Sequence, residues 1–240
     1  MNAESKEFRY VGTELELFQQ ATTWKDYFCR YIRPYVRGKV LEVGAGIGAN
    51  TSYLYNSAVN SWLRLEPDTG QAQVIGHKAQ TGALPKRCSV RNGILSDLEK
   101  GLNFDAILYL DVLEHIEADG EELRKASDHV APRGCIILLS PAHQWLFSKF
   151  DKSVGHFRRY DKRSLRDLTP PSLTLEKQAY LDSAGVMASA VNRFFLKSAM
   201  PNQKQIHFWD RILVPISKIL DPALGYQLGK SVVTIWRKAT

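Results

Sequence analysis

The stretch that decides the fold is Lys39-Val-Leu-Glu-Val-Gly-Ala-Gly-Ile-Gly48, an apolar run that contains one acid and ends in three alternating glycines. The apolar residues predict a buried strand over 39–43. Gly44, Gly46 and Gly48 predict a tight turn after it, because glycine has no Cβ and lets the backbone come close to a ligand. A helix is expected to begin near Ala49-Asn-Thr51, so the stretch reads as the start of a cofactor-binding unit.

Glu42 distinguishes between two kinds of cofactor. Taken alone, Gly44-x-Gly46-x-x-Ala49 fits the fingerprint of proteins that bind dinucleotides. A carboxylate two residues before the first glycine would repel a pyrophosphate in a partly buried cleft. It would attract a ligand that carries a sulfonium and an ammonium, and that ligand is S-adenosylmethionine. An exposed acid at the end of a strand is the alternative for Glu42.

Two further apolar runs also end in acids. Trp62-Leu-Arg-Leu-Glu66 places Glu66 about 20 residues after the glycine turn, where an acid can accept hydrogen bonds from ribose hydroxyls. The run over 104–110 leads into Asp111-Val-Leu-Glu-His-Ile116, and Asp111 is a candidate for the methionyl end of the cofactor. The alternatives are a helix-entry acid before Pro67 for Glu66 and an N-cap for Asp111.

Strands alternate with helices along the chain and predict a doubly wound α/β fold with a parallel sheet. We expect the ligand beyond the carboxyl ends of the strands. Further elements are a helix over 13–36 stopped by Pro34, a loop over 141–161, and helical spacing over 184–220 broken by Pro201 and Pro215. The expected strands are 39–43, 61–66, 87–92, 104–110, 133–140, 173–180 and 231–237, and the remaining helices are 70–80 and 120–129.

At this point residues 38–140 resemble the class I S-adenosylmethionine-dependent methyltransferases of the type 12 kind. The resemblance rests on Val-Leu-Glu-x-Gly-x-Gly-x-Gly, the acid after the second strand, and Asp-Val-Leu-Glu-His-Ile after the fourth. It implies a Rossmann-like, mostly parallel seven-stranded sheet in a single domain over 1–240. The ends 1–36 and 184–220 then form an N-terminal helical cap and a C-terminal helical insertion over the substrate site.

The resemblance also implies a fuller set of cofactor contacts. Ala45, Pro67 and Val112 adjoin the residues above and belong to this set. Related enzymes commonly have an acid just after the third strand that reaches the adenine amino group. This chain has Asn92-Gly-Ile-Leu-Ser-Asp97 there, so backbone groups and apolar packing at Gly93, Ile94 and Leu95 are expected to hold the adenine.

Three histidines are candidates for the base that takes the proton of a hydroxyl acceptor, since histidine titrates near neutral pH. His143 follows the fifth strand by three residues and is the first choice. His156 lies further along the same loop, and His115 lies in the motif after the fourth strand. The alternatives are solvated loop histidines for the first two and a packed histidine for His115.

The run Gly155-His-Phe-Arg-Arg-Tyr-Asp-Lys-Arg163 mixes basic and aromatic residues and suggests a substrate-binding loop. Arg158 and Arg159 are expected to grip phosphate or carboxylate oxygens, with Tyr160 beside them. Trp145 is a candidate for the wall of an apolar substrate pocket. The run resembles methyltransferases associated with polysaccharide and glycan biosynthesis, which implies a glycan-like anionic acceptor. A solvated basic face and plain core packing are the alternatives.

Composition limits the other possibilities. The formal charge of +7 favours an anionic partner without selecting one. Three cysteines without metal-ligand spacing suggest neither disulfides nor a metal site, and no signal peptide or bilayer-spanning run is found, so a cytoplasmic protein is expected. Peripheral contact with a membrane is possible through 186–200, where Phe194 and Phe195 accompany Arg193 and Lys197.

Four functions therefore compete. A methyltransferase that acts on oxygen of a small or glycan-like acceptor is favoured. A nucleic-acid methyltransferase is disfavoured, since the motif of amino-methylating DNA enzymes is replaced by Asp111-Val-Leu-Glu114. A non-catalytic S-adenosylmethionine-binding subunit stays open, and Glu42 disfavours an NAD-dependent oxidoreductase.

Overall fold

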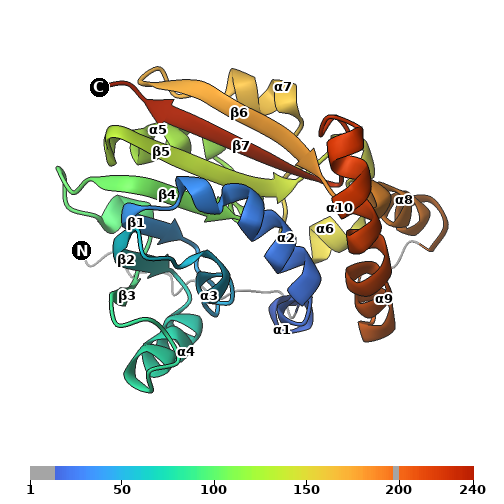
Figure 1. Cartoon of the computed structure of the whole chain (residues 1–240), viewed down its shortest axis with the longest axis horizontal. Coiled ribbons are helices and arrows are strands. Elements are labelled where there is room, and N and C mark those ends of the chain that lie inside the picture. The colour runs from blue at the N-terminus through green and yellow to red at the C-terminus, as the bar shows by residue number, and fades with distance from the viewer. Residues whose placement is uncertain (1–13, 197–199) are drawn as a thin grey trace, which may run out of the picture.

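The computed structural model describes residues 14–196 and 200–240, and its centre is one seven-stranded sheet (Figure 1). The strand order is β3-β2-β1-β4-β5-β7-β6. The five strands β1 to β5 run parallel to one another, whereas β7 is antiparallel to both of its neighbours, β5 and β6. The predicted mostly parallel α/β sheet is confirmed. The strands are β1 (Gly38–Val43), β2 (Val59–Glu66), β3 (Cys88–Asn92), β4 (Phe104–Leu110), β5 (Val130–Pro141), β6 (Leu173–Leu181) and β7 (Ser231–Lys238).

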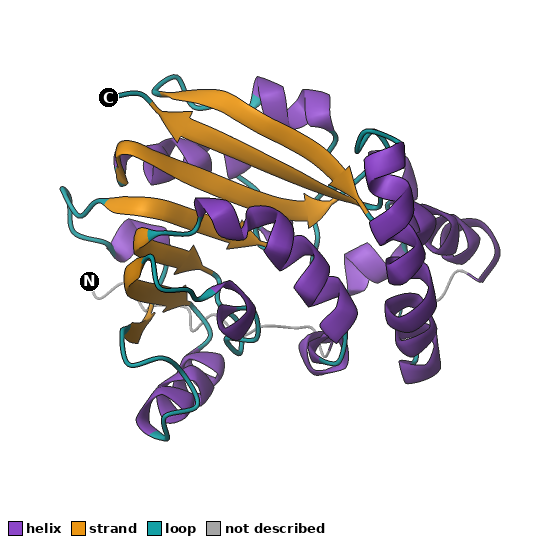
Figure 2. Cartoon of the chain, in the orientation of Figure 1, coloured by secondary structure: helices purple, strands orange, loops and turns teal. Residues whose placement is uncertain are grey.

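Helices cover both faces of the sheet (Figure 2). On one face, α2 and α3 pack on apolar residues of the strands, and Leu54 of α3 is fully buried there. On the other face, α5 and α7 bury Leu123 and Leu165. These helices are α2 (Thr22–Ile32), α3 (Thr51–Leu54), α5 (Asp119–Asp128) and α7 (Lys162–Asp167), while α4 (Thr69–Gln80) contacts β2 and β3.

The predicted continuous helix over 13–36 is wrong, because α1 (Glu14–Gln19) and α2 are separate. The Lys25 ammonium donates hydrogen bonds of 2.9 Å to two carbonyls at the end of α1. At the start of α2, the Asp210 carboxylate accepts a 2.9 Å bond from the Trp24 N–H. Both helix ends are thus capped by side chains, which stabilises the break. Residues 1–13 of the expected cap lie outside the described part of the chain.

The expected helical segment near the C-terminus is present, but Pro215 does not break it. The chain stays helical through α9 (Gln203–Phe208), the π turn η6 (Trp209–Leu213) and α10 (Val214–Ala223). At the end of η6, the Val214 N–H donates to the carbonyl of Trp209, five residues earlier. This wider turn lies directly before the proline, whose ring would clash with the carbonyl of a regular helix.

The first part of the segment is α8 (Ser183–Val191), which continues into the π turn η5 (Asn192–Leu196). Pro201 lies between the two helical runs, as predicted. Helices α8, α9 and α10 gather beyond the carboxyl ends of β4 and β5 (Figure 1). In the described residues, no helix is both long and apolar enough to cross a membrane.

The segment 141–161, predicted to be a loop, also contains a short helix, α6 (Lys149–Ser153). Ser148 begins this helix, and its N–H donates to the Asp151 carboxylate at 2.8 Å. Such reciprocal capping makes a short helix favourable between irregular segments. The cysteines Cys29, Cys88 and Cys135 are all buried and free.

Candidate active site

The glycine turn after β1 has the backbone that the sequence predicts. Gly44, Gly46 and Gly48 have φ angles of +64°, +57° and +71°, which L side chains rarely adopt. A Cβ on Gly44 would lie 2.8 Å from the side chain of Val112, so the turn after β1 directly contacts the turn after β4. Ala45 is buried, and its N–H bonds the Leu65 carbonyl of β2. The carboxyl ends of three strands therefore meet here.

Glu66 ties the glycine turn to the end of β2. Its carboxylate accepts hydrogen bonds from the N–H groups of Gly46 at 2.6 Å and Asp68 at 2.9 Å. Desolvation raises the pKa of Glu66 to about 7, although these two bonds lower it. Glu66 is 3% exposed and lies where the glycine turn and the end of β2 meet. Its bonds to ribose, like a contact of the neighbouring Pro67, stay predictions.

Glu42 faces the interior of the sheet. It is 2% exposed and accepts hydrogen bonds from the Trp62 indole at 3.0 Å and the Thr51 hydroxyl at 3.4 Å. The fully buried Arg64 guanidinium lies 3.6 Å away. Desolvation raises the pKa of Glu42, and Arg64 opposes this shift. Glu42 therefore pairs mainly with a cation of the protein itself, Arg64, and its charge is less available to attract a cationic cofactor.

The turn after β3 is organised by Asp97. Its carboxylate accepts the Ile94 N–H at 2.8 Å and lies so close to Gly93 that a Cβ there would clash at 2.7 Å. The Ile94 side chain is 51% exposed, whereas Leu95 is buried. The adenine could thus pack on Ile94 and on the backbone of Gly93, while the Leu95 side chain points into the core. These adenine contacts remain predictions.

Asp111 begins the turn after β4 with a positive φ of 56°, which is uncommon for a residue with a side chain. The residue is exposed to solvent, yet the surrounding protein desolvates it enough to raise its pKa, while His156 and Lys230 lower it. Asp111 is thus exposed to solvent and at the same time close to charged groups of the protein. A ligand-facing side chain has this environment.

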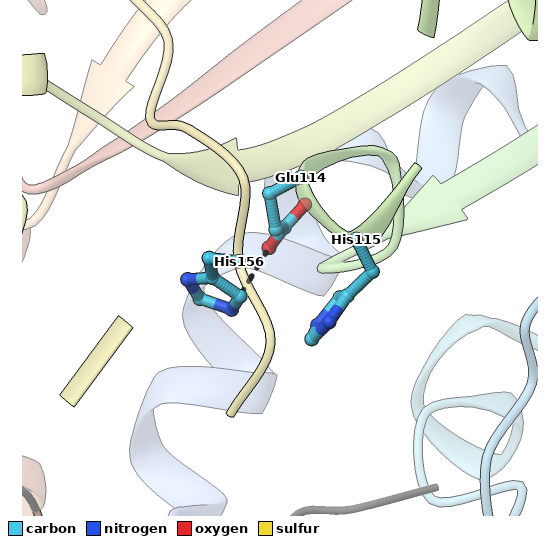
Figure 3. A group of neighbouring side chains, drawn as sticks. All are labelled: Glu114, His115 and His156. Atoms are coloured by element: carbon cyan, nitrogen blue, oxygen red, sulfur yellow. Dashed lines mark ion pairs between the residues drawn. The ribbon is translucent and has the colours of Figure 1, made fainter. Parts of the chain in front are cut away.

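Next to Asp111, three side chains from two segments meet: Glu114, His115 and His156 (Figure 3). The rings of the two histidines stand edge to face with centroids 4.6 Å apart, and His156 Nε2 lies 4.0 Å from Glu114 Oε1. Desolvation raises the pKa of the fully buried Glu114, and the charge of Asp111 raises it further. Burial lowers the pKa of His115 to about 4, so its imidazole is neutral at physiological pH.

Asp151 orients His156. Its Oδ1 lies 2.9 Å from His156 Nδ1, so the other ring nitrogen faces Glu114. Asp151 is itself fully buried and held by the Arg159 guanidinium through bonds of 2.8 and 3.0 Å. The bond to Asp151 and the nearby carboxylates raise the pKa of His156 against the effect of burial. An imidazole with one oriented, basic nitrogen results.

His143, the first choice for a base, lies in a different environment. Its ring contacts those of Tyr180 and Trp145, with centroids 4.7 and 5.9 Å away. The backbone N–H of His143 donates to the Tyr160 carbonyl, and the residue has a positive φ of 65°. Burial lowers the pKa of its imidazole. The structure brings His115 and His156 together with Asp111 and leaves His143 outside this group.

The two arginines predicted to grip an anionic acceptor are already paired within the protein, and their contact with an acceptor stays a prediction. Arg159 binds the buried Asp151, and Arg158 lies 2.6 Å from Asp119 and also bonds a backbone carbonyl. Tyr160 is 2% exposed and donates to the same Asp119 at 2.8 Å. These side chains fix the loop to the domain. Trp145 differs, since it is 51% exposed and available to a ligand.

The methyltransferase domain family matches residues 18–170, which include the glycine turn, Glu66, Asp111 and the histidine cluster. The chain belongs to this family. At the level of the family, the predicted methyltransferase class and the cofactor S-adenosylmethionine are confirmed.

A ubiquinone biosynthesis O-methyltransferase of Azorhizobium caulinodans is 29% identical over 110 residues, which cover 45% of this chain and 42% of that protein. Less than half of the relative's length is therefore matched. A geranyl diphosphate methyltransferase in complex with S-adenosylmethionine superposes with a TM-score of 0.65 at 10% identity, over 95% of this chain and 91% of that one. Coclaurine N-methyltransferase, bound to N-methylheliamine and S-adenosylhomocysteine, gives 0.60 at 15% identity, over 97% and 76%. At these identities the two structures show a shared fold.

Three residues of this methyltransferase domain site were missed in the sequence. Glu114 stands inside the quoted motif after β4, between residues that were singled out. Asp151 has a signal in Ser148-x-x-Asp151, a capping pattern that predicts a bonded acid without indicating its contact to His156. Arg64 has no signal, because a charged residue in a strand is ordinarily expected at the surface.

Proposed function

We propose that the protein transfers a methyl group from S-adenosylmethionine to a hydroxyl oxygen of a small-molecule acceptor. The observation that carries the proposal is the meeting of Asp111 with Glu114, His115 and His156 beside the glycine turn. In the transfer, the C–S bond of the sulfonium breaks as a C–O bond forms, and S-adenosylhomocysteine leaves. The acceptor hydroxyl loses its proton, and that loss is what the cluster assists.

The cofactor side of the proposal uses the turns after β1, β2 and β3. The ribose binds Glu66, the adenine packs at Gly93–Leu95, and the methionyl group lies against Asp111. Holding donor and acceptor in line and excluding water supplies much of the rate in such a displacement. The site residues are arranged for this, since they lie on turns that the sheet holds together.

Oxygen is favoured over nitrogen because a hydroxyl must lose its proton, and this chain has an oriented histidine where a proton has to leave. The name of the Azorhizobium relative, an O-methyltransferase, points the same way. A glycan-like anionic acceptor loses its main support, because Arg158 and Arg159 are bound to Asp119 and Asp151.

The test is a transfer assay with methyl-labelled S-adenosylmethionine and a panel of phenols, diols and sugars, each beside its amine analogue. We expect label in hydroxyl compounds and its loss in His156→Gln, with cofactor affinity retained. A matched control is His77→Gln, an exposed histidine of α4. Label found in the amines alone would contradict the proposal.

A further inference from the structure

We propose that Glu114, His115 and His156 form a binding site for one divalent transition-metal ion. One ligand atom of each residue lies within 4.8 Å of the other two (Figure 3). Around a tetrahedral zinc ion, with bonds of roughly 2.1 Å, neighbouring ligand atoms are about 3.4 Å apart. Side-chain rotations that move each atom by about 1 Å would therefore close the site around an ion.

The ligands are oriented as metal ligands usually are. His156 has one ring nitrogen on the Asp151 carboxylate at 2.9 Å, which directs the other toward Glu114. A carboxylate behind a histidine is the common outer support of a metal-bound imidazole. Glu114 has a similar support, because the Ser140 hydroxyl donates to Oε2 at 2.9 Å.

An unsatisfied oxygen points into this site. Glu114 is fully buried, and its Oε1 has no hydrogen-bond partner. A buried acceptor without a partner destabilises a protein by about 1–3 kcal/mol, and more when it is charged. A cation between Glu114 Oε1 and His156 Nε2, which are 4.0 Å apart, would satisfy both atoms.

The nearby cations of the protein bind elsewhere. Arg159 pairs with Asp151, Lys25 donates to two backbone carbonyls, and the Lys230 ammonium lies 3.7 Å from Asp182. Asp111, next to the cluster, adds a second carboxylate. The local charge therefore favours an added cation.

The donor set indicates which ions would bind. One carboxylate and two imidazoles suit zinc, cobalt, iron or manganese, whereas calcium and magnesium prefer oxygen ligands alone. Three protein ligands leave a coordination position open. In the metal-bound site His156 holds the ion and does not itself take the proton. An acceptor hydroxyl in the open position would instead lose its proton more easily because a bound metal lowers its pKa, and only this last step rests on the proposed function.

The experiment is a calorimetric titration of the chelator-treated full chain with Zn²⁺ and Co²⁺, together with the visible absorption of bound Co²⁺. We expect one ion per chain with a low-coordinate Co²⁺ spectrum. His156→Gln and His115→Gln should abolish saturable binding, and Asp151→Asn should weaken it about 10- to 100-fold. His77→Gln, the exposed control, should bind as the wild type does.

Absence of saturable binding to the wild-type chain, or equal binding by both cluster variants, would overturn the metal site. If the variant at His156, whose side chain is 7% exposed, does not fold, the His115 variant decides the question. S-adenosylmethionine is titrated into the same metal-free sample. A chain that binds the cofactor but no metal loses only the metal site, whereas one that binds metal but no cofactor loses the proposed function.

A different observation concerns the outer surface of α8, α9 and α10, from which we infer a docking surface for an anionic membrane. Large apolar side chains are exposed there: Met187 (69%), Val191 (46%), Phe194 (56%), Phe208 (56%), Ile212 (49%), Ile216 (42%), Ile219 (75%), Leu220 (41%) and Leu224 (44%). So many exposed large apolar side chains on three neighbouring helices favour an interaction surface. Phe195 and Lys197, which were also expected here, lie outside the described side chains.

The charge of this segment identifies the partner. Between residues 183 and 230 the only acids are Asp210 and Asp221, and both are buried. Basic residues stand among the apolar ones, and Lys204 and Arg211 line a groove of about 680 Å³ with Phe208. Apolar side chains with cations and without exposed anions suit the surface of an anionic bilayer.

The test is co-sedimentation of the full chain with vesicles of phosphatidylcholine, with and without phosphatidylglycerol. We expect binding that requires the anionic lipid, falls in Phe208→Ser and Ile219→Ser, and weakens in Lys204→Gln/Arg211→Gln. The control is Val74→Ser, an exposed apolar residue of α4. Equal binding by the variants, or dimers in solution that the same substitutions dissociate, would overturn the membrane surface.

Discussion

The buried pair of Glu42 and Arg64 makes the sharpest mutational prediction. Both side chains are almost fully buried, at 2% and 0% exposure, and their closest atoms lie 3.6 Å apart. Glu42 also accepts bonds from Trp62 and Thr51, whereas Arg64 Nη1 and Nη2 have no hydrogen-bond partner. Glu42→Gln keeps the shape of the side chain and removes the charge that compensates the guanidinium.

Removing one partner of a buried ion pair destabilises a protein by about 3–5 kcal/mol. In a domain of this size, each kcal/mol lowers the Tm by about 2–4 °C, so Glu42→Gln should lower it by about 6–20 °C. Arg64→Met should cost less, because the remaining carboxyl can take up a proton, whereas arginine cannot lose one. The double variant Glu42→Gln/Arg64→Met should recover most of the loss, since no uncompensated charge remains.

Urea denaturation of the wild type, the two single variants and the double variant gives the free energy of unfolding for each. A double-mutant cycle then isolates the interaction between the two side chains. A Glu42→Gln variant within about 1 kcal/mol of the wild type, or a double variant no more stable than Glu42→Gln, would refute the reasoning.

The other predictions concern the turns and the loop. Gly44→Ala should destabilise the fold by more than the roughly 1–2 kcal/mol of left-handed strain, because the new Cβ would also clash with Val112. Gly82→Ala, where the Cβ has open space at a φ of +76°, should show the strain alone, and urea denaturation measures both variants. Arg159→Gln should cost about 3–5 kcal/mol by the same assay, since its carboxylate partner is buried, and the more exposed Arg158→Gln about 1 kcal/mol. The folded pKa of Glu66 is about 7 against 4.5 unfolded, so this carboxyl stabilises the fold at low pH and loses that effect as pH rises to about 7. Glu66→Gln should therefore gain stability relative to the wild type between about pH 4.5 and 7 in thermal melts, and a constant difference would contradict this account.

Much of the sheet could be predicted from the sequence, because buried parallel strands read as short apolar runs between turn residues. The turn at Gly44, Gly46 and Gly48 could also be predicted, since three glycines so close together indicate a backbone with positive φ angles. The break between α1 and α2 was not, because it depends on Asp210, which is 186 residues away from Trp24 in the chain. The spacing of apolar residues within a helix cannot reveal a capping residue so far away in the chain.

The site residues divide in the same way. The positions of Glu66 and Asp111 could be predicted because each follows an apolar run directly, and the sheet brings those ends together; their cofactor contacts stay predictions. The ion pairs of Arg158 and Arg159 could not be predicted, because their charge is visible in sequence and their partners Asp119 and Asp151 are not. The position of His156 was hidden for the same reason, since Asp151 is what orients His156 beside Glu114.

The central claim is that the glycine turn and Glu66 bind S-adenosylmethionine, and calorimetric titration of the wild-type chain and Glu66→Ala tests it most directly. We expect one-to-one binding by the wild type, none of NAD, and affinity for S-adenosylmethionine about 10- to 100-fold weaker in the variant, the effect of losing a hydrogen bond to a charged group. Binding of NAD without S-adenosylmethionine, or equal affinity in Glu66→Ala, would contradict the claim.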